Sequence, residues 1–362
     1  MINQRHLVYP PVVLAHIVES LGDMFSPKAR GKSSIQLHYS AQLNGNPHMG
    51  TITSLASAFA IGEYLSDAYD KPSSLLFEAL ENAPTDQKQI GDKTYCRMHC
   101  DSVQDGRPKS EIFMDSFRVL LEYFSRETAV PYEVLYYKPF QEEEFVRRTL
   151  LDIIDRQDEF IPFIAPSEKY LRIRFPCPNC RYMEKTSKDS KIVRRSGKHD
   201  LTFESICPTD GGFEVRVTPG NKSFIDFNTS IRNVIKEARF IEDAKRDNAL
   251  NLMVDGGDWV GMAYQVASSL DLLGYRFREM PSRIFTPIIE DWSGAKFSKS
   301  IYVKEGTYGD VPEEFVNFTL LQERFGDRGL ELSLNEAREW AKEPRKLFRN
   351  YSVEYLREVF KV

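Results

Sequence analysis

Hydrophobic positions along the first half of the chain alternate between short strand-like runs and longer segments with helical spacing. Residues 34–39 and 73–77 have the β-rich, apolar character of buried strands, and residues 52–64 place apolar side chains at helical spacing. Further helices are predicted at 110–123 and 142–156, with a strand at 134–137 between them. This alternation predicts an α/β fold built on a Rossmann-like, doubly wound parallel sheet.

The pattern changes around residue 175. The segment that follows is β-rich, and a helix at 230–246 and a strand at 250–254 then return to the sheet. A pair of helices at 313–325 and 334–356, the second broken at Pro344, ends the sequence. The predicted units are an N-terminal helical preamble (1–32), the first half of the core with connective helices (33–174), an inserted zinc-ribbon-like unit (175–217), the second half of the core (218–303) and a C-terminal helical segment (304–362).

Composition indicates a globular protein. The chain has 362 residues, of which 41% are hydrophobic and 12% aromatic, enough for a large core. A net charge of −5 means that the whole-molecule field does not attract RNA, so any tRNA contact needs a local basic patch. We expect no membrane span and no secretory leader, and five cysteines, an odd number, favour a reduced, cytoplasmic setting.

The turn between the first strand and the first long helix contains candidate phosphate-binding residues. It has the sequence Asn-Gly-Asn-Pro-His-Met-Gly-Thr over residues 44–51, and its glycines permit a tight passage of the backbone. A helix N-terminus offers free N–H groups to phosphate, and His48 adds a donor. The binding candidates here are Gly45, Asn46, His48, Gly50 and Thr51. The alternative is an ordinary strand–helix turn with an incidental histidine.

A second motif lies about 250 residues later in the numbering. Gly294 opens the segment Gly-Ala-Lys-Phe-Ser-Lys-Ser, in which Lys296 and Lys299 flank Ser298. Two ammonium groups on a loop suit the negative charge that develops on a departing pyrophosphate. The alternative is a solvated basic loop.

Together these segments resemble the signatures of class I aminoacyl-tRNA synthetases. His-Met-Gly-Thr at residues 48–51 looks like their "HIGH" motif, and Lys-Phe-Ser-Lys-Ser at 296–300 looks like "KMSKS". Between them, Asp255, Gly256, Gly257 and Asp258 stand where the family carries a motif that cradles adenine and ribose. The resemblance implies formation of aminoacyl-AMP from ATP, Mg²⁺ and an amino acid, with His48, Lys296 and Lys299 as the catalytic residues.

Within that class the layout looks most like the class I lysyl-tRNA synthetases, because a Cys-Pro-Asn-Cys knuckle follows the connective helices. If lysine is the substrate, its ammonium needs an acidic partner, for which Glu78 and Glu81 after the second strand are candidates. Two departures stand out. The Asp-Gly-Gly-Asp segment differs from the lysyl branch's Gly-Lys-Asp-His, and no counterpart of the helical anticodon-binding region follows residue 300. tRNA is therefore a candidate partner that the protein would bind without an anticodon-binding region.

The knuckle predicts a structural zinc site. Cys177 and Cys180 form one ligand pair, and Cys207 with Asp210 forms a second at the same spacing. His199 is an alternative fourth ligand, and loss of the metal is a further alternative. A second cluster, Cys96-x₂-His99-Cys100, is interpreted as structural.

Six of the basic residues between the two halves of the knuckle are considered together: Lys185, Lys188, Lys191, Arg194, Arg195 and Lys198. They fit either a finger that reaches phosphates, such as a tRNA acceptor end, or a solvated hairpin tip, which is the commoner outcome for a run of charges.

Three functions fit the sequence. The first is a synthetase-type ligase whose acceptor is tRNA, a small molecule or a carrier. The second is a catalytically silent module that binds amino acid or ATP, and the third is a small-molecule nucleotidyltransferase. The combination of His48, Lys296 and Lys299 favours the ligase, and the residues leave open which amino acid it activates.

Overall fold

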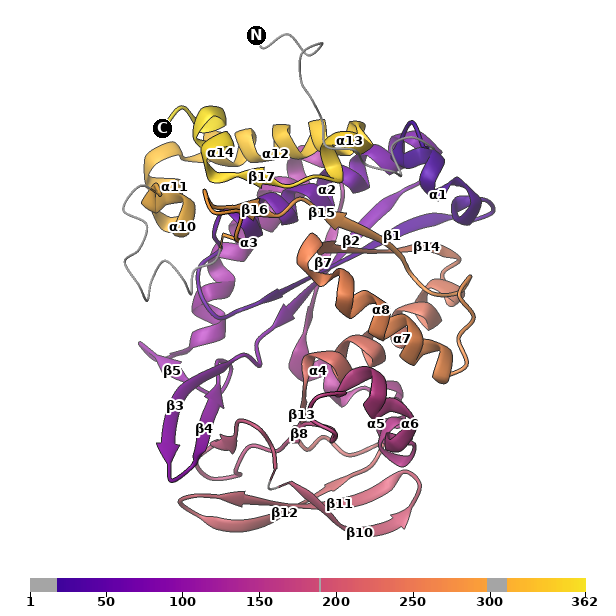
Figure 1. The fold of residues 1–362 in the computed structure, drawn as a ribbon, viewed down its shortest axis with the longest axis vertical. Coiled ribbons are helices and arrows are strands. Elements are labelled where there is room, and N and C mark those ends of the chain that lie inside the picture. Colours follow the sequence, from indigo (N-terminus) through magenta and orange to yellow (C-terminus); the bar gives the residue numbers. More distant parts are fainter. Residues whose placement is uncertain (1–17, 189, 298–310) are drawn as a thin grey trace.

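A five-stranded parallel sheet forms the centre of the computed structural model, which describes residues 18–188, 190–297 and 311–362 (Figure 1). Its strands follow the spatial order β15-β14-β1-β2-β7, which is 5-4-1-2-3 along the chain. They are β1 (Ser34–Gln42), β2 (Ser73–Leu80), β7 (Tyr132–Tyr136), β14 (Ala249–Gly256) and β15 (Ser282–Thr286). The strand order reverses between β1 and β14, so the crevice at their carboxyl ends is where this fold binds ligands. The predicted fold class is confirmed.

Helices pack on both faces of the sheet. One hydrophobic cluster joins β1 and β2 to α1 (Leu21–Ala29), α2 (Met49–Tyr69), α3 (Lys109–Thr128) and the C-terminal helices. A second cluster joins α7 (Thr229–Arg246) and α8 (Val260–Leu272) to the connective helices and the inserted strands. The connective helices are α4 (Tyr137–Glu142), α5 (Glu144–Asp155) and α6 (Gln157–Ile164). In the predicted helical preamble (1–32) the structure shows helix α1 over Leu21–Ala29, and residues 1–17 lie outside the described part.

Two small antiparallel sheets lie beyond the core, in the lower part of Figure 1. β10 (Lys191–Gly197), β11 (Asp200–Cys207) and β12 (Gly211–Val217) form the predicted β-rich insertion. β3 (Pro84–Ile90), β4 (Lys93–Met98) and β9 (Met183–Glu184) form the other sheet. The polar sequence of residues 81–91 would predict irregular structure, and the strand β3 shows that this interpretation is wrong. The side chains of β3 are intermediate or exposed, which removes the apolar alternation that marks a strand. Short pairs join β8 (Ile173–Arg174) to β13 (Asp226–Phe227) and β5 (Val103–Gln104) to β6 (Arg107–Pro108).

The C-terminal segment covers α2. Its elements are α10 (Glu313–Val316), α11 (Phe318–Phe325), α12 (Asp327–Lys342), α13 (Pro344–Leu347), β17 (Tyr351–Ser352) and α14 (Val353–Phe360). The break expected at Pro344 is confirmed, because this residue begins α13. The helix expected to continue to 356 is interrupted by β17, which pairs with β16 (Ile289–Glu290). Residues 301–303, which end the predicted second half of the core, lie outside the described residues. Among the described helices, none has the length and apolar character that a membrane crossing requires.

Candidate active site

A cavity of about 670 Å³ opens at the carboxyl ends of β1 and β14. Its walls come from the β1–α2 turn, the end of β14, α7 and the segment after β16. Nine of the predicted binding residues line it: Gly45, Asn46, His48, Gly50, Thr51, Asp255, Gly256, Asp258 and Lys296. Two motifs far apart in the sequence therefore share one cavity at the switch point of the sheet. Ser298 and Lys299 lie outside the described residues.

His48 is fixed at the start of α2. It is the N-cap residue, and its Nδ1 accepts a hydrogen bond from the Gly50 backbone N–H at 3.1 Å. A neutral ring that accepts at Nδ1 carries its proton on Nε2, so Nε2 is the donor nitrogen. A side chain at residue 50 would crowd this ring, because a Cβ there would lie 2.9 Å from the His48 Cε1. Gly50 therefore allows the His48 ring to lie directly against the N-terminus of α2.

The turn before His48 is tied to the C-terminal helices. The Asn46 side-chain amide donates to the Asn317 and Thr319 side chains, both at 3.3 Å. The backbone N–H of Phe318 donates to the Pro47 carbonyl at 3.1 Å. These contacts hold the turn between β1 and α2 against α11, which the sequence alone did not indicate.

The end of β14 supplies the acidic wall. Asp255 lies 3.5 Å from the Arg283 guanidinium, and Asp258 forms an ion pair with Lys296 at 2.5 Å between Oδ2 and Nζ. A Cβ at Gly256 would lie 2.7 Å from the Asp258 Oδ1, so only glycine at position 256 lets the Asp258 carboxylate lie this close to the backbone. Gly257 is not on the cavity wall; a Cβ there would meet Ile288 at 3.3 Å.

Lys296 is presented by a tight turn that Asp291 organises. The Asp291 carboxylate accepts hydrogen bonds from the Ser293 and Ala295 backbones at 2.8 and 3.2 Å. The backbone N–H of Phe297 then returns to the Ile289 carbonyl at 2.8 Å. Phe297 is buried, and its ring meets the His48 ring at 81° with centroids 5.7 Å apart. This contact joins the two predicted motifs directly.

Two cations on α7 complete the cavity, and the sequence analysis missed both. Arg232 and Lys236 lie four residues apart on one helix face and are almost fully buried. The available signal was their position directly after the buried Ile231 and Ile235 in a strongly amphipathic helix.

The structure places neither predicted acidic substrate residue on the cavity wall. Glu78 is buried against α7, where its Oε2 pairs with the Lys236 Nζ at 3.0 Å. Glu81 accepts a hydrogen bond from the Lys138 backbone at 2.9 Å, and burial raises the pKa of its carboxyl. The strand end that was expected to present carboxylates to substrate instead buries them against neighbouring helices.

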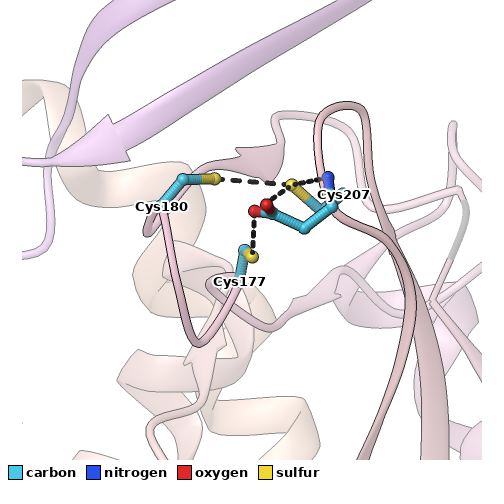
Figure 2. Close-up of side chains that lie close together, drawn as sticks. Cys177, Cys180 and Cys207 are labelled. Carbon is cyan, nitrogen blue, oxygen red and sulfur yellow. Dashed lines mark hydrogen bonds between the residues drawn. The ribbon is translucent and has the colours of Figure 1, made fainter.

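The four predicted zinc ligands lie together. Figure 2 shows Cys177, Cys180 and Cys207 around one point, and their sulfur atoms and an Asp210 oxygen lie within 4.8 Å of one another. The Cys180 and Cys207 sulfurs are 3.4 Å apart, and the Cys177 sulfur is 3.1 Å from Asp210 Oδ2. A tetrahedral zinc with Zn–S bonds near 2.3 Å separates its ligands by about 3.8 Å, so this donor set fits the ion.

The other metal candidates are used differently. His199 Nε2 lies 2.9 Å from Asp152 Oδ1, against α5, so the alternative fourth ligand is not at the cluster. Cys96, His99 and Cys100 do not form a metal-binding group in the described part of the chain. Three of the six insertion cations, Arg194, Arg195 and Lys198, have acidic partners within 3.7 Å, which fits the solvated hairpin better than a phosphate finger.

Comparisons with known proteins return distant structural matches. No family model and no curated protein matches the chain. A glutamate-tRNA synthetase from Elizabethkingia anophelis aligns with 12% identity and a TM-score of 0.33, over 75% of this chain and 54% of its own. A glutamate tRNA ligase from Elizabethkingia meningosepticum, solved with its amino acid, aligns with 14% identity and a TM-score of 0.33, over 75% and 53%. A putative arginyl-tRNA synthetase from Campylobacter jejuni aligns with 9% identity and a TM-score of 0.38, over 93% and 70%.

The chain thus spans about half the length of the two glutamate-specific enzymes. Similarity at this level concerns the arrangement of secondary structure and says nothing about the substrate.

Proposed function

We propose that this protein activates an amino acid with ATP, forming aminoacyl-AMP and pyrophosphate in the manner of class I aminoacyl-tRNA synthetases. The observation that carries the proposal is the meeting of His48 and the Lys296–Phe297 segment on one cavity at the switch point of the sheet. A strand–helix phosphate site and a separate lysine turn suit a reaction that holds a triphosphate and releases part of it.

The chemistry follows from these groups. A carboxylate oxygen of the amino acid attacks the α-phosphorus of ATP, and the bond from that phosphorus to the pyrophosphate oxygen breaks. The His48 Nε2–H and the N-terminus of α2 bind phosphate oxygens, and Lys296, with Lys299, offsets the charge on the departing pyrophosphate. The nucleophile is already ionised, so the site needs no general base, and most of the catalysis is positioning.

The remaining roles fall to the end of β14 and to the insertion. Asp255, Gly256 and Asp258 border the cavity where the nucleoside would lie, and the carboxylates of the two aspartates are of the donor type that Mg²⁺ accepts. Mg²⁺ bound with ATP would supply charge neutralisation at the phosphates. Cys177, Cys180, Cys207 and Asp210, none of which lines the cavity, would hold a structural Zn²⁺.

The deciding experiment is ATP–pyrophosphate exchange with each of the twenty amino acids, first without and then with total tRNA. Exchange supported by one amino acid establishes the ligase, and dependence on tRNA identifies the acceptor. Exchange that needs no tRNA leaves a small molecule or a carrier as the acceptor to be tested. A flat response to all twenty under both conditions contradicts the proposal and favours the silent binding module.

A further inference from the structure

The inner wall of the cavity carries two buried cations. Arg232 is 5% exposed and Lys236 is 4% exposed, and both side chains line the cavity from the first half of α7. Buried charges are costly unless they are paired, so each of these side chains needs a partner.

Lys236 has its partners within the protein. Its Nζ lies 3.0 Å from the Glu78 Oε2 and donates to the Ser40 Oγ at 2.9 Å. The Glu78 carboxylate is therefore already neutralised, and Lys236 stands between it and the cavity.

Among the described residues, Arg232 has no comparable partner. Its recorded contact is a long hydrogen bond of 3.4 Å from Nη2 to the Thr229 Oγ1. Its Nε is buried and finds no acceptor in the described part of the chain. The nearby carboxylate of Asp226 is held by the Arg174 guanidinium and by the Asn82 amide, so it is not available to Arg232.

The carboxylates nearest to Arg232 already have cationic partners. Asp226 pairs with Arg174 and Glu78 pairs with Lys236, so Arg232 has no ion pair of its own among the described residues. Burial lowers the pKa of Arg232, and the opposing effect of the nearby Asp226 and Glu78 carboxylates offsets this only in part. A ligand that brings a carboxylate would complete the wall, whereas a second ammonium would add repulsion.

We propose that Arg232 binds a side-chain carboxylate of the amino acid, so that the activated substrate is acidic rather than lysine. This inference rests on the proposed function and names its substrate class. A planar guanidinium matches a carboxylate geometrically and pairs with it through two hydrogen bonds. Arg232 is then a specificity-determining residue, while the α-carboxylate of the substrate remains free to attack ATP.

The test uses three pairs of amino acids that differ in charge at similar length: aspartate and asparagine, glutamate and glutamine, and 2-aminoadipate and lysine. Binding to the full chain is measured by calorimetry, and activation is measured by ATP–pyrophosphate exchange. We expect one acidic member to bind and exchange well above its partner. Replacing Arg232 by glutamine (R232Q) should weaken the binding of that acid by about 30-fold or more.

Two further variants separate binding from folding. Arg232→Lys keeps the charge and should recover part of the affinity, which a purely structural role would not predict. Arg246→Gln removes an exposed arginine from the far end of the same helix and should leave binding unchanged. Thermal melting of all three variants shows whether each remains folded.

The outcomes distinguish the two proposals. Exchange with lysine or a neutral amino acid, at affinity independent of Arg232, overturns the acidic assignment and leaves the ligase intact. Binding of an acidic amino acid that depends on Arg232, without any exchange, supports the inference and contradicts the ligase. Failure of all six amino acids to bind overturns the inference.

Discussion

The ammonium of Lys296 lies 2.5 Å from the carboxylate of Asp258, across the mouth of the cavity. Both side chains remain partly exposed, at 48% and 33%, so water screens the pair and its net contribution to stability is about 0–1 kcal/mol. A weak pair of this kind exchanges partners at little cost. In the structure the pair joins the lysine turn to the end of β14, and a bound triphosphate would compete with Asp258 for the lysine.

Replacing Lys296 by alanine should lower the rate of ATP–pyrophosphate exchange by about 10²–10³, as expected for loss of one charge-stabilising donor. ATP binding, measured by calorimetry, should change much less. Lys361→Ala, at an exposed lysine near the C-terminus, is the matched control. Unchanged exchange in the Lys296 variant would remove the turn from the mechanism. Lys299 lies outside the described residues, and the resemblance predicts a similar loss for Lys299→Ala.

Phe297 should couple the two motifs. Phe297→Ala removes a buried ring that packs edge-on against His48, and we expect it to cost about 3–5 kcal/mol of stability as well as activity. Phe297→Leu keeps most of the buried volume and should cost less than about 1.5 kcal/mol. If the leucine variant melts near the wild type but exchanges slowly, the aromatic contact positions His48. Full activity in the leucine variant would show that burial alone is required.

The sequence was most informative where local pattern and local structure agree. The strands at 34–39 and 73–77 and the helix at 230–246 are confirmed within a few residues, because each carries a continuous apolar face. β3 was missed, because its polar residues gain their partners only through pairing with β4.

In the site, too, the residues with a local sequence signal were predicted, and those that depend on tertiary contacts were not. The glycine-flanked turn at His48 carries its own signal, since the helix start and the phosphate site are local features. Arg232 and Lys236 became visible only when α7 was placed beside the end of β2, which brought Glu78 to Lys236. Glu78 and Glu81, the candidate substrate residues, do not line the cavity. The sequence shows these carboxylates, but it does not show that Lys236 pairs with Glu78 and lies between it and the cavity.

Buried neutral histidines should make the fold sensitive to acid. Burial, with a smaller contribution from Lys109, lowers the pKa of His99 from 6.5 to about 4. Between these values the unfolded chain binds more protons, so stability falls as pH falls from 6.5 to 4, by roughly 3 kcal/mol for a shift of this size. His38, fully buried, acts in the same direction.

Urea unfolding at several pH values measures this effect. His99→Gln should flatten the dependence between pH 6.5 and 4, with the contribution of His38 still present. A variant whose stability follows the wild type across that window would show that His99 titrates normally in the folded protein.

The cysteine cluster predicts one tightly bound zinc per chain. Cys177→Ser removes a buried ligand and should lower both zinc content and the melting temperature, because metal binding contributes to folding. Asp210→Cys completes a four-cysteine site and should retain the metal more strongly against a chelator. Cys100→Ser, outside the cluster, is the matched control and should keep the zinc. Elemental analysis of freshly purified protein tests this prediction. If the protein contains no zinc and a chelator does not change its melting temperature, the four side chains lie together without binding a metal.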